Sequence, residues 1–301
     1  MRTQHLISAL ALAVVATHAA PARAQTSGIS LSGLSPLYTG VDIESATVPS
    51  NPATTGGAPT TSRAYIARID LRAPGISLVT TPQSGPLNTT AQVLSQFAIT
   101  QKVRVAINAN FFSPCCDVMV EPKTVIGLLV SKGATVAPNS VVALNSPFVL
   151  ALTKKNEAVI APAAQIDLAK TYTAVAGSAI IVQNGVDNSA NSPDQGDPGD
   201  PNPRTVVGLS KDNRYLYLVA IDGRVTGYST GTTNTQSAAL MLALNCYNAL
   251  NLDGGGSTEM VYASKIGQPY IVNLPSDGWE RYDGAALGVY AKPLPAASAA
   301  H

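Results

Sequence analysis

The segment LNLDGGGSTEMVY (250–262) carries the most unusual local pattern in this chain of 301 residues. A strand-like apolar stretch leads to Asp253, and Gly254, Gly255, Gly256 and Ser257 follow it. Each glycine weakens a strand or helix by roughly 0.5–1 kcal/mol, so three in succession need a reason. They form either a tight turn or a surface where backbone N–H groups approach an anion or a sugar, with Asp253 at its rim. No Gly-Lys-Ser/Thr follows, which excludes a phosphate-binding P-loop.

Three other strand-like runs carry polar residues at their ends. Arg204 lies directly before the apolar run in NPRTVVGLS (202–210), Asp222 and Arg224 follow YLVAI (217–221), and Asn108 ends a run in AINANFF (106–112). Each of these alone is more typical of a hairpin turn or a solvated strand end. Sites are common where strands end in loops, so we expect these residues and Asp253 to meet in one hollow.

The amino terminus resembles a secretory leader. MRTQHLISALALAVVATHAAPARA has a cationic start, an apolar run too short to span a bilayer, and Ala22-Arg23-Ala24 in the pattern that signal peptidase cleaves. We therefore expect a secreted or periplasmic protein with no membrane span after cleavage. The chain is 12% charged with a net charge of +1, which argues against nucleic-acid binding, since that requires a basic face.

Histidine chemistry is nearly excluded once the leader is removed. Of three histidines, two lie in the leader, and the third, His301, is the last residue. Ser-His-Asp catalysis and His-based zinc sites both require histidines held within the fold. We therefore expect Ser229 in GYSTG (227–231) to have a turn or hydrogen-bonding role and not to be the nucleophile of a nucleophile elbow. Acid and base work falls to Asp, Glu, Tyr, Lys or a thiol, and we expect no cofactor and no metal.

Two features leave alternatives open. Cys246 could form a disulfide with Cys115 or Cys116, or all three thiols could be free and buried. Asp194, Asp197 and Asp200 in the loop SANSPDQGDPGDPNP (189–203) could bind calcium, although a solvated acidic loop is the simpler interpretation.

Short runs of β-branched and aromatic residues between Gly, Pro and Asn predict many strands. Only 89–100 and 233–245 have helical patterns, the second behind a Thr/Asn/Ser start. We expect an α+β fold, strand-rich, with mixed or antiparallel sheets and a few helices. The predicted organisation is a leader (1–24), a flexible N-terminal segment (25–62), one domain (63–292) that includes the 189–203 loop as an insertion, and a C-terminal tail (293–301).

The ordered set AINANFF, NPRTVVGLS, AIDGR, STG (229–231) and NALNLDGGGS (248–257) resembles the phosphodiester glycosidase (NAGPA, DUF2233) domain family, whose animal member is the uncovering enzyme of the mannose-6-phosphate pathway. ERYDGAALGV (280–289) resembles the family's terminal segment. The resemblance runs from about Arg63 to Ala291. It departs from the family at Asn108-Ala109-Asn110, at Cys246 and at Glu259.

The resemblance implies hydrolysis of a sugar-1-phosphodiester at the glycosidic C1–O bond, which releases the sugar and a phosphomonoester. Arg204 would bind the phosphate, Asp253 would be nucleophile or base, and Asp222 its partner. Substrate would also contact the residues Asn108, Gly254, Gly255, Gly256, Ser257, Arg224, Ser229 and Arg281. A phosphodiester oxygen is a good leaving group, so a histidine acid is not required.

Two other classes of function remain. One is an exported glycosidase that acts on an envelope or environmental polysaccharide without phosphate. The other is a non-catalytic protein that binds glycans or assembles exopolysaccharide and retains the pocket without turnover.

Overall fold

The computed structural model describes residues 28–50, 60–116, 119–139, 146–191, 200–264 and 266–295. In these ranges strands dominate, and the two α-helices are α1 (Leu94–Gln101) and α2 (Asn234–Ala243). The expectation of a strand-rich fold is confirmed, but the fold is mostly β rather than α+β. Every strand pair in the described ranges is antiparallel.

The largest sheet has nine strands in the order β1-β3-β4-β18-β17-β19-β15-β16, with β2 paired to β3. Its strands are β1 (Ser30–Leu31), β2 (Ser35–Tyr38), β3 (Val41–Ser50), β4 (Thr60–Asp70), β15 (Ala179–Gln183), β16 (Val186–Asp187), β17 (Arg204–Leu209), β18 (Tyr215–Ile221) and β19 (Asn248–Asn251). Three smaller sheets have the orders β11-β10-β14-β12-β13, β21-β20-β7-β22-β5 and β6-β9-β8.

The smaller sheets contain thirteen strands, and their bounds complete the description of the fold. They are β5 (Ser77–Thr80), β6 (Thr89–Thr90), β7 (Val105–Asn108), β8 (Phe112–Ser113), β9 (Pro122–Val125), β10 (Leu129–Ser131), β11 (Ala134–Ala137), β12 (Phe148–Thr153), β13 (Ala158–Pro162), β14 (Thr171–Gly177), β20 (Met260–Ala263), β21 (Pro269–Ile271) and β22 (Ala286–Tyr290).

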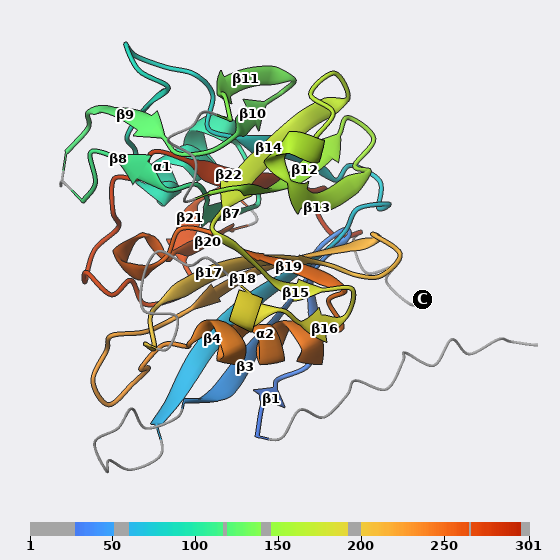
Figure 1. Cartoon of the computed structure of the whole chain (residues 1–301), viewed down its shortest axis with the longest axis vertical. Coiled ribbons are helices and arrows are strands. Elements are labelled where there is room, and N and C mark those ends of the chain that lie inside the picture. Colours follow the sequence, from blue (N-terminus) through green and yellow to red (C-terminus); the bar gives the residue numbers. More distant parts are fainter. Residues whose placement is uncertain are drawn as a thin grey trace, which may run out of the picture.

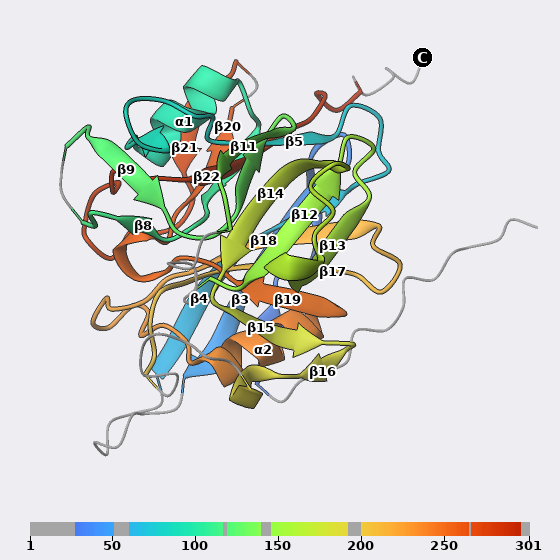
Figure 2. The same cartoon turned by 45° about the horizontal axis from the view of Figure 1, so that its top comes forward.

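The sheets and helices form layers around two main cores. One core lies between the large sheet and the two five-stranded sheets, with Val207, Leu218, Ile107 and Leu150 among its members. The other lies on the opposite face of the large sheet, under α2. In Figures 1 and 2, α2 lies below β19 of the large sheet, and β12 and β14 lie above β19. The alternation of strand side chains between the two faces is what supplies both cores.

Both expected helices are present, and each is shorter than its sequence pattern predicted. α2 begins after Thr233, whose hydroxyl accepts from the Gln236 N–H while the Gln236 side chain accepts from the Thr233 N–H. This capping box satisfies two backbone donors that the helix leaves open. α1 starts five residues later than its pattern suggested, because Thr89–Thr90 forms β6 instead. No helix in the described part of the chain is long and apolar enough to cross a bilayer.

The N-terminal segment differs from the expectation of a flexible extension. β3 pairs with β4 along its whole length, from Val41 opposite Ile69 to Ser50 opposite Thr60. Its buried alternate residues, such as Ala46 and Val48, join the core under α2. The leader itself, and Asp194 and Asp197 in the acidic loop, lie outside the described residues.

The cysteines follow neither of the expected arrangements. Cys115 and Cys116 form a disulfide with each other, and Cys246 is free and buried. Cys246 packs in the core under α2, beside Gly208. It is therefore a small core side chain rather than a partner for a distant cysteine.

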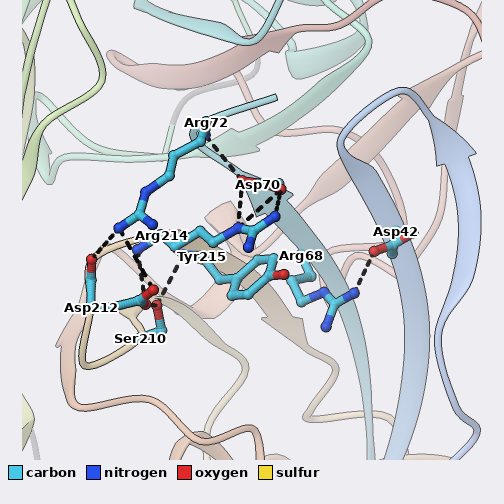
Figure 3. Close-up of polar contacts among 8 residues, drawn as sticks. All are labelled: Asp42, Arg68, Asp70, Arg72, Ser210, Asp212, Arg214 and Tyr215. Carbon is cyan, nitrogen blue, oxygen red and sulfur yellow. Dashed lines mark hydrogen bonds and ion pairs between the residues drawn. The ribbon is translucent and has the colours of Figure 1, made fainter. Parts of the chain in front are cut away.

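One end of the large sheet, at the turn between β17 and β18, carries a cluster of paired charges (Figure 3). The Arg214 guanidinium donates to both Asp70 carboxylate oxygens at 2.8–3.2 Å. Arg72 lies 3.6 Å from Asp212. A third pair, Arg68 with Asp42 at 2.6 Å, joins β4 to β3. We call these three ion pairs the hairpin-end cluster.

Candidate active site

At the opposite end of the large sheet, the chain turns sharply after β19. The Asp253 N–H donates to the Ala109 carbonyl, and the Gly255 N–H donates to the Pro203 carbonyl at 2.9 Å. A side chain on Gly254 would lie 2.8 Å from that same carbonyl, and Gly255 has φ +62°. The first two glycines are therefore required for a close backbone approach and a left-handed turn. We call residues 253–257 the glycine turn.

Two arginines border the glycine turn. Arg224 Nη1 lies 3.2 Å from the position that a Gly255 Cβ would occupy, and its guanidinium also donates to Asn202 Oδ1. Arg281 packs so closely on Gly256 that any side chain there would collide with it. Arg281 Nη1 lies 3.4 Å from Ser257 Oγ, and its other donors bind Asp277. The third glycine thus makes room for a guanidinium.

Two carboxyl groups share this corner. The pKa of Asp253 rises to about 7 because of burial, although Ser257 and the Arg281 charge oppose the rise. Burial, together with the negative charge of Asp253, raises the pKa of Asp283 well above its ordinary value, and Ser257 and Arg281 again oppose the rise. The two groups therefore titrate as a coupled pair around Ser257. Asp253 is partly exposed, whereas Asp283 is buried.

Asp283 was missed at the level of sequence. It lies inside the ERYDGAALGV segment, two residues after Arg281 and directly before Gly284. Its backbone pairs with Gln92, which brings the segment before β22 beside the segment before α1. The sequence does offer a signal for this residue. Asp283 is an acid followed by glycine just before a strand, and it lies two residues after an arginine that is expected to bind substrate.

A second acidic pair lies behind the first. Burial and the adjacent carboxylates of Glu280 and Asp283 raise the pKa of Glu259 to about 10, so this group is protonated at neutral pH. Glu280 accepts hydrogen bonds from the Ser95 N–H and hydroxyl at 2.8 and 2.6 Å. These bonds attach the loop before β22 to the start of α1. Glu259, where the chain departs from the family pattern, is buried beside Glu280.

Asp222 is buried close to the glycine turn but has its own partners. Its Oδ1 accepts from Asn273 Nδ2 at 3.0 Å and from the Leu274 N–H at 2.9 Å. Burial raises its pKa, and these two hydrogen bonds partly oppose the rise. Asn273 also donates to the Thr258 carbonyl at 3.0 Å. Asp222 thus connects to the glycine turn through Asn273, not through contact with Asp253.

The Asn108 amide makes three hydrogen bonds inside the protein. Its Nδ2 donates to the Asp253 carbonyl at 2.8 Å, and its Oδ1 accepts from the Thr205 hydroxyl and the Glu259 N–H. Asn108 is buried. Asn108 thus binds the chain at Asp253, the first residue of the glycine turn, and at Glu259, two residues after its end.

The structure places the side chain of Arg204 against backbone carbonyls of neighbouring loops. Thr205 points to Asn108, so its neighbour Arg204 points to the other face of the sheet, because strand side chains alternate. There its Nε donates to the Thr232 carbonyl at 2.8 Å, and its Nη2 lies 3.5 Å from the Asp200 carbonyl. These contacts give no support to a phosphate-binding role. They show that Arg204 holds the loop before α2.

Ser229 has the turn role that the sequence predicted. Its hydroxyl donates to the Asp222 carbonyl at 2.6 Å and accepts from the Arg63 N–H at 3.0 Å. It is buried. It therefore fixes the loop that carries Asp222 and Arg224.

Several buried polar atoms around the glycine turn have no hydrogen-bond partner. Among them are Thr258 Oγ1, Glu259 Oε1 and Asp283 Oδ1. Unpartnered buried polar groups are rare and costly, and they concentrate where a ligand or water binds. No group of three or more His, Cys, Asp or Glu side chains in the described ranges is arranged to hold a metal ion. The corner is thus equipped with carboxyls, a hydroxyl, guanidinium groups and backbone N–H groups.

The family model described as phosphodiester glycosidase (NAGPA) matches residues 101–290. The chain therefore belongs to the phosphodiester glycosidase family, and the resemblance seen in its motifs is confirmed.

Solved structures share the fold. The catalytic domain of zebrafish N-acetylglucosamine-1-phosphodiester alpha-N-acetylglucosaminidase, auto-inhibited by its pro-peptide, superposes with a TM-score of 0.60 at 20% identity, covering 88% of both chains. A Burkholderia pseudomallei K96243 protein described as exported gives a TM-score of 0.65 at 15% identity, covering 88% of this chain and 97% of the other. At these identities the likeness concerns the fold.

A curated relative matches over a shorter stretch. The uncharacterized SPbeta prophage-derived protein YomE of Bacillus subtilis (strain 168) is 39% identical over 79 residues. The match spans 26% of this chain and 11% of YomE.

Proposed function

We propose that this chain is a hydrolase that cleaves the glycosidic C1–O bond of a sugar-1-phosphodiester and releases free sugar and a phosphomonoester. The observation that carries the proposal is the coupled pair Asp253 and Asp283, placed beside a glycine turn that two arginines border. Family membership and the name of the zebrafish enzyme support a sugar-1-phosphate diester as the substrate class.

The phosphate binds, in this proposal, where positive charge and backbone donors coincide. Arg224 lies against Gly255 and Arg281 against Gly256, and a planar guanidinium suits phosphate oxygens. Arg224 is exposed and holds φ +60°, an uncommon conformation for a residue other than glycine. Such conformations cluster at ligand sites. We therefore assign phosphate binding to Arg224 and Arg281 in place of Arg204.

The carboxyl pair supplies the proton transfers. With a pKa of about 7, Asp253 is suited to a general base that takes a proton from water as the water oxygen bonds to C1. The C1–O bond breaks, and its electron pair stays on the phosphate oxygen. Asp283, whose pKa burial raises well above its ordinary value, donates its proton to that oxygen, and the proton on Asp253 then returns to Asp283. Pairs of acids with separated pKa values mark such assignments.

Asp222, Asn108 and Arg204 act in this proposal by position. Asn108 holds the carbonyl of Asp253, Asp222 is linked to the Thr258 carbonyl through Asn273, and Arg204 supports the loop before α2. They keep the glycine turn and its loops in register, which matters because small displacements of catalytic groups are costly in rate.

The test is hydrolysis of α-N-acetylglucosamine-1-phosphate methyl ester in ¹⁸O-enriched water. We expect ¹⁸O in the released sugar and none in methyl phosphate, because the C1–O bond breaks rather than the P–O bond. Label in the phosphate would refute glycosidic cleavage. Asp70→Asn, a carboxyl change in the hairpin-end cluster, is the matched control for Asp253→Asn.

Direct attack by water at C1 also predicts that the first-formed sugar has the inverted anomeric configuration. Proton NMR during the first minutes of turnover measures this configuration. A retained configuration would assign Asp253 as a nucleophile instead of a base, within the same hydrolase.

We further propose that the chain is exported. The leader-like residues 1–24 and the fold shared with a protein described as exported support this location. Mass spectrometry of the protein from a periplasmic or culture fraction, with an N-terminus at Gln25, is the expected observation.

A further inference from the structure

Trp279 is the single tryptophan of the chain, and 59% of its side chain is exposed. Tryptophan is highly buried on average, because removing its large apolar ring from water is favourable. Trp279 lies in the loop that joins β21 to β22, and the same loop contains Arg281 and Asp283 of the candidate active site. An exposed indole in this particular loop therefore needs a physical reason.

The positions around Trp279 are held in place by hydrogen bonds. Asp277 Oδ2 accepts two hydrogen bonds from the Arg281 guanidinium, at 3.0 and 2.6 Å. The Glu280 carboxylate accepts two from Ser95, at 2.8 and 2.6 Å. The loop is thus fixed on both sides of Trp279, although most of the indole faces solvent. A side chain on a fixed backbone loses less conformational entropy when it binds a ligand.

Trp279 lies near the glycine turn. Asp277 and Arg281, two positions before and after it, pack so closely on Gly256 that a side chain there would collide with both. Cα atoms two positions apart are separated by at most about 7 Å, so the Trp279 backbone is that close to each of these residues. The space next to it is open, since a Cβ on Gly278 would have no atom within 4 Å. An exposed indole on this backbone is within reach of a ligand at the glycine turn.

The proposed chemistry places the sugar, and not the alcohol, on this side of the turn. Asp253 and Asp283 act at C1 and at its oxygen, so the sugar lies beside these two carboxyls. The positive charge of Arg281 opposes the rise in the pKa of both carboxyls, which places its guanidinium next to them. Arg224 instead approaches the turn from the side of Asn202, to which it donates. The sugar ring is therefore expected on the side that carries the exposed indole.

A sugar ring suits an indole better than a phosphate does. A pyranose carries hydroxyls around its edge and C–H groups on its faces, and the negative face of an aromatic ring attracts the weakly positive C–H hydrogens. The same negative face repels an anion. Resting on the proposed function, we infer that Trp279 stacks on the sugar ring of the substrate and thereby contributes to selectivity for the sugar, while Arg281 binds the phosphate attached to it.

The first test uses the fluorescence of Trp279, which reports on this position alone because the chain has no other tryptophan. Excitation at a wavelength that tyrosine does not absorb isolates its signal. We expect α-N-acetylglucosamine-1-phosphate to shift the emission to shorter wavelength, because a sugar on the indole displaces water. Dimethyl phosphate, a phosphodiester without a sugar, should leave the emission unchanged. An equal response to both ligands, or a response to neither, would overturn the inference.

Steady-state kinetics on the methyl ester of α-N-acetylglucosamine-1-phosphate provide the second test. Trp279→Ala should raise KM by about tenfold, a typical effect of one apolar contact in a binding site, with a smaller effect on kcat. Trp279→Phe retains an aromatic ring and should recover most of the lost affinity. Leu168→Ala, at a position of similar exposure (51%) between β13 and β14, is the matched control and should keep the wild-type KM. A thermal melt confirms that each variant folds.

The two assignments fail in different ways. If the methyl ester releases no sugar while α-N-acetylglucosamine-1-phosphate still shifts the emission, the hydrolase assignment is wrong and the sugar contact stands. If Trp279→Ala hydrolyses the ester with the wild-type KM, the hydrolase assignment stands and the sugar contact is wrong. An equal rise of KM in Leu168→Ala would also overturn the sugar contact.

Discussion

The two ends of β17 and β18 carry acids in opposite electrostatic settings. At the hairpin end, burial of Asp70 is outweighed by its hydrogen bonds to Arg214, so its pKa is lowered (Figure 3). Asp212 also has a lowered pKa, chiefly because Ser210 donates to it. At the other end, burial raises the pKa of Asp222, and the same holds for Asp253 on the adjacent strand.

The difference lies in the partners rather than in the strands. The hairpin-end carboxylates are matched one to one with arginines, which stabilises their charged forms. Around the glycine turn Arg281 is shared between Asp277 and two further acids, and burial prevails. Perturbed pairs in a loop cluster are typical of functional sites, whereas matched surface pairs are typical of structural ones. We therefore assign a structural role to the acids at the hairpin end and a chemical role to the acids at the glycine turn.

The largest effect is expected for Asp253→Asn. Loss of the general base should lower kcat by about 10³-fold, within the range that general acid–base groups contribute. Asp283→Asn should have an effect of similar size on the same ester. Steady-state kinetics on the methyl ester measures both. If Asp70→Asn lowered kcat as much as Asp253→Asn, the assignment of catalysis to the glycine turn and not to the hairpin end would be wrong.

The next effect concerns phosphate binding. Arg224→Gln or Arg281→Gln should lower kcat/KM by about 10- to 100-fold, because a hydrogen bond to a charged group is worth roughly 1.5–3 kcal/mol. Arg214→Gln, in the hairpin-end cluster, is the matched control and should leave kcat/KM near wild type. Inhibition by inorganic phosphate should weaken in parallel in the first two variants only. Unchanged inhibition in Arg224→Gln would remove that residue from the phosphate site.

The dependence of activity on pH provides the third comparison. Because the base must be ionised, kcat/KM should rise as the pH increases through about 7, the pKa of Asp253. It should fall again at higher pH as Asp283 loses its proton. Arg281→Gln removes a charge that lowers the pKa of Asp253, so the rising limb should move to higher pH. Asp70→Asn should not move it. A rising limb near pH 4 would contradict the raised pKa of Asp253.

The smallest effect concerns stability, and its sign differs between the two ends. A carboxyl with a raised pKa in the folded state stabilises the fold at low pH, and that contribution is lost as the pH rises through the folded pKa. Asp253→Asn should therefore stabilise the protein at pH 8 by roughly 2 kcal/mol, or about 5 °C in Tm. Asp70 has a lowered pKa, so its contribution is present at neutral pH and is lost as the pH falls below about 4.

Thermal melts at pH 8 of wild type, Asp253→Asn and Asp70→Asn measure this contrast. The first variant should melt above wild type and the second below it. A lower Tm for Asp253→Asn would show that the carboxylate at the glycine turn is a structural ion-pair member, like those at the hairpin end.

The sequence alone predicts structure where chemistry local to the chain decides it. Three glycines after an acid require a special backbone whatever surrounds them, and Thr233 caps α2 through residues three positions away. The absence of a usable histidine next to GYSTG was likewise sufficient to assign Ser229 to a turn. These inferences depend on neighbours in the chain, which a sequence displays directly.

The remaining assignments needed the fold. Arg204 and Thr205 are adjacent in sequence, yet the pleat of β17 sends one to the loop before α2 and the other to Asn108. Asp283 lies 30 positions after Asp253 and reaches the same corner only because its segment pairs with Gln92. The residue types and the turn were determined by sequence alone. Only the tertiary structure decided which carboxyls are buried together and therefore have raised pKa values. Strand register brings these side chains to one corner, and the loops around them exclude water.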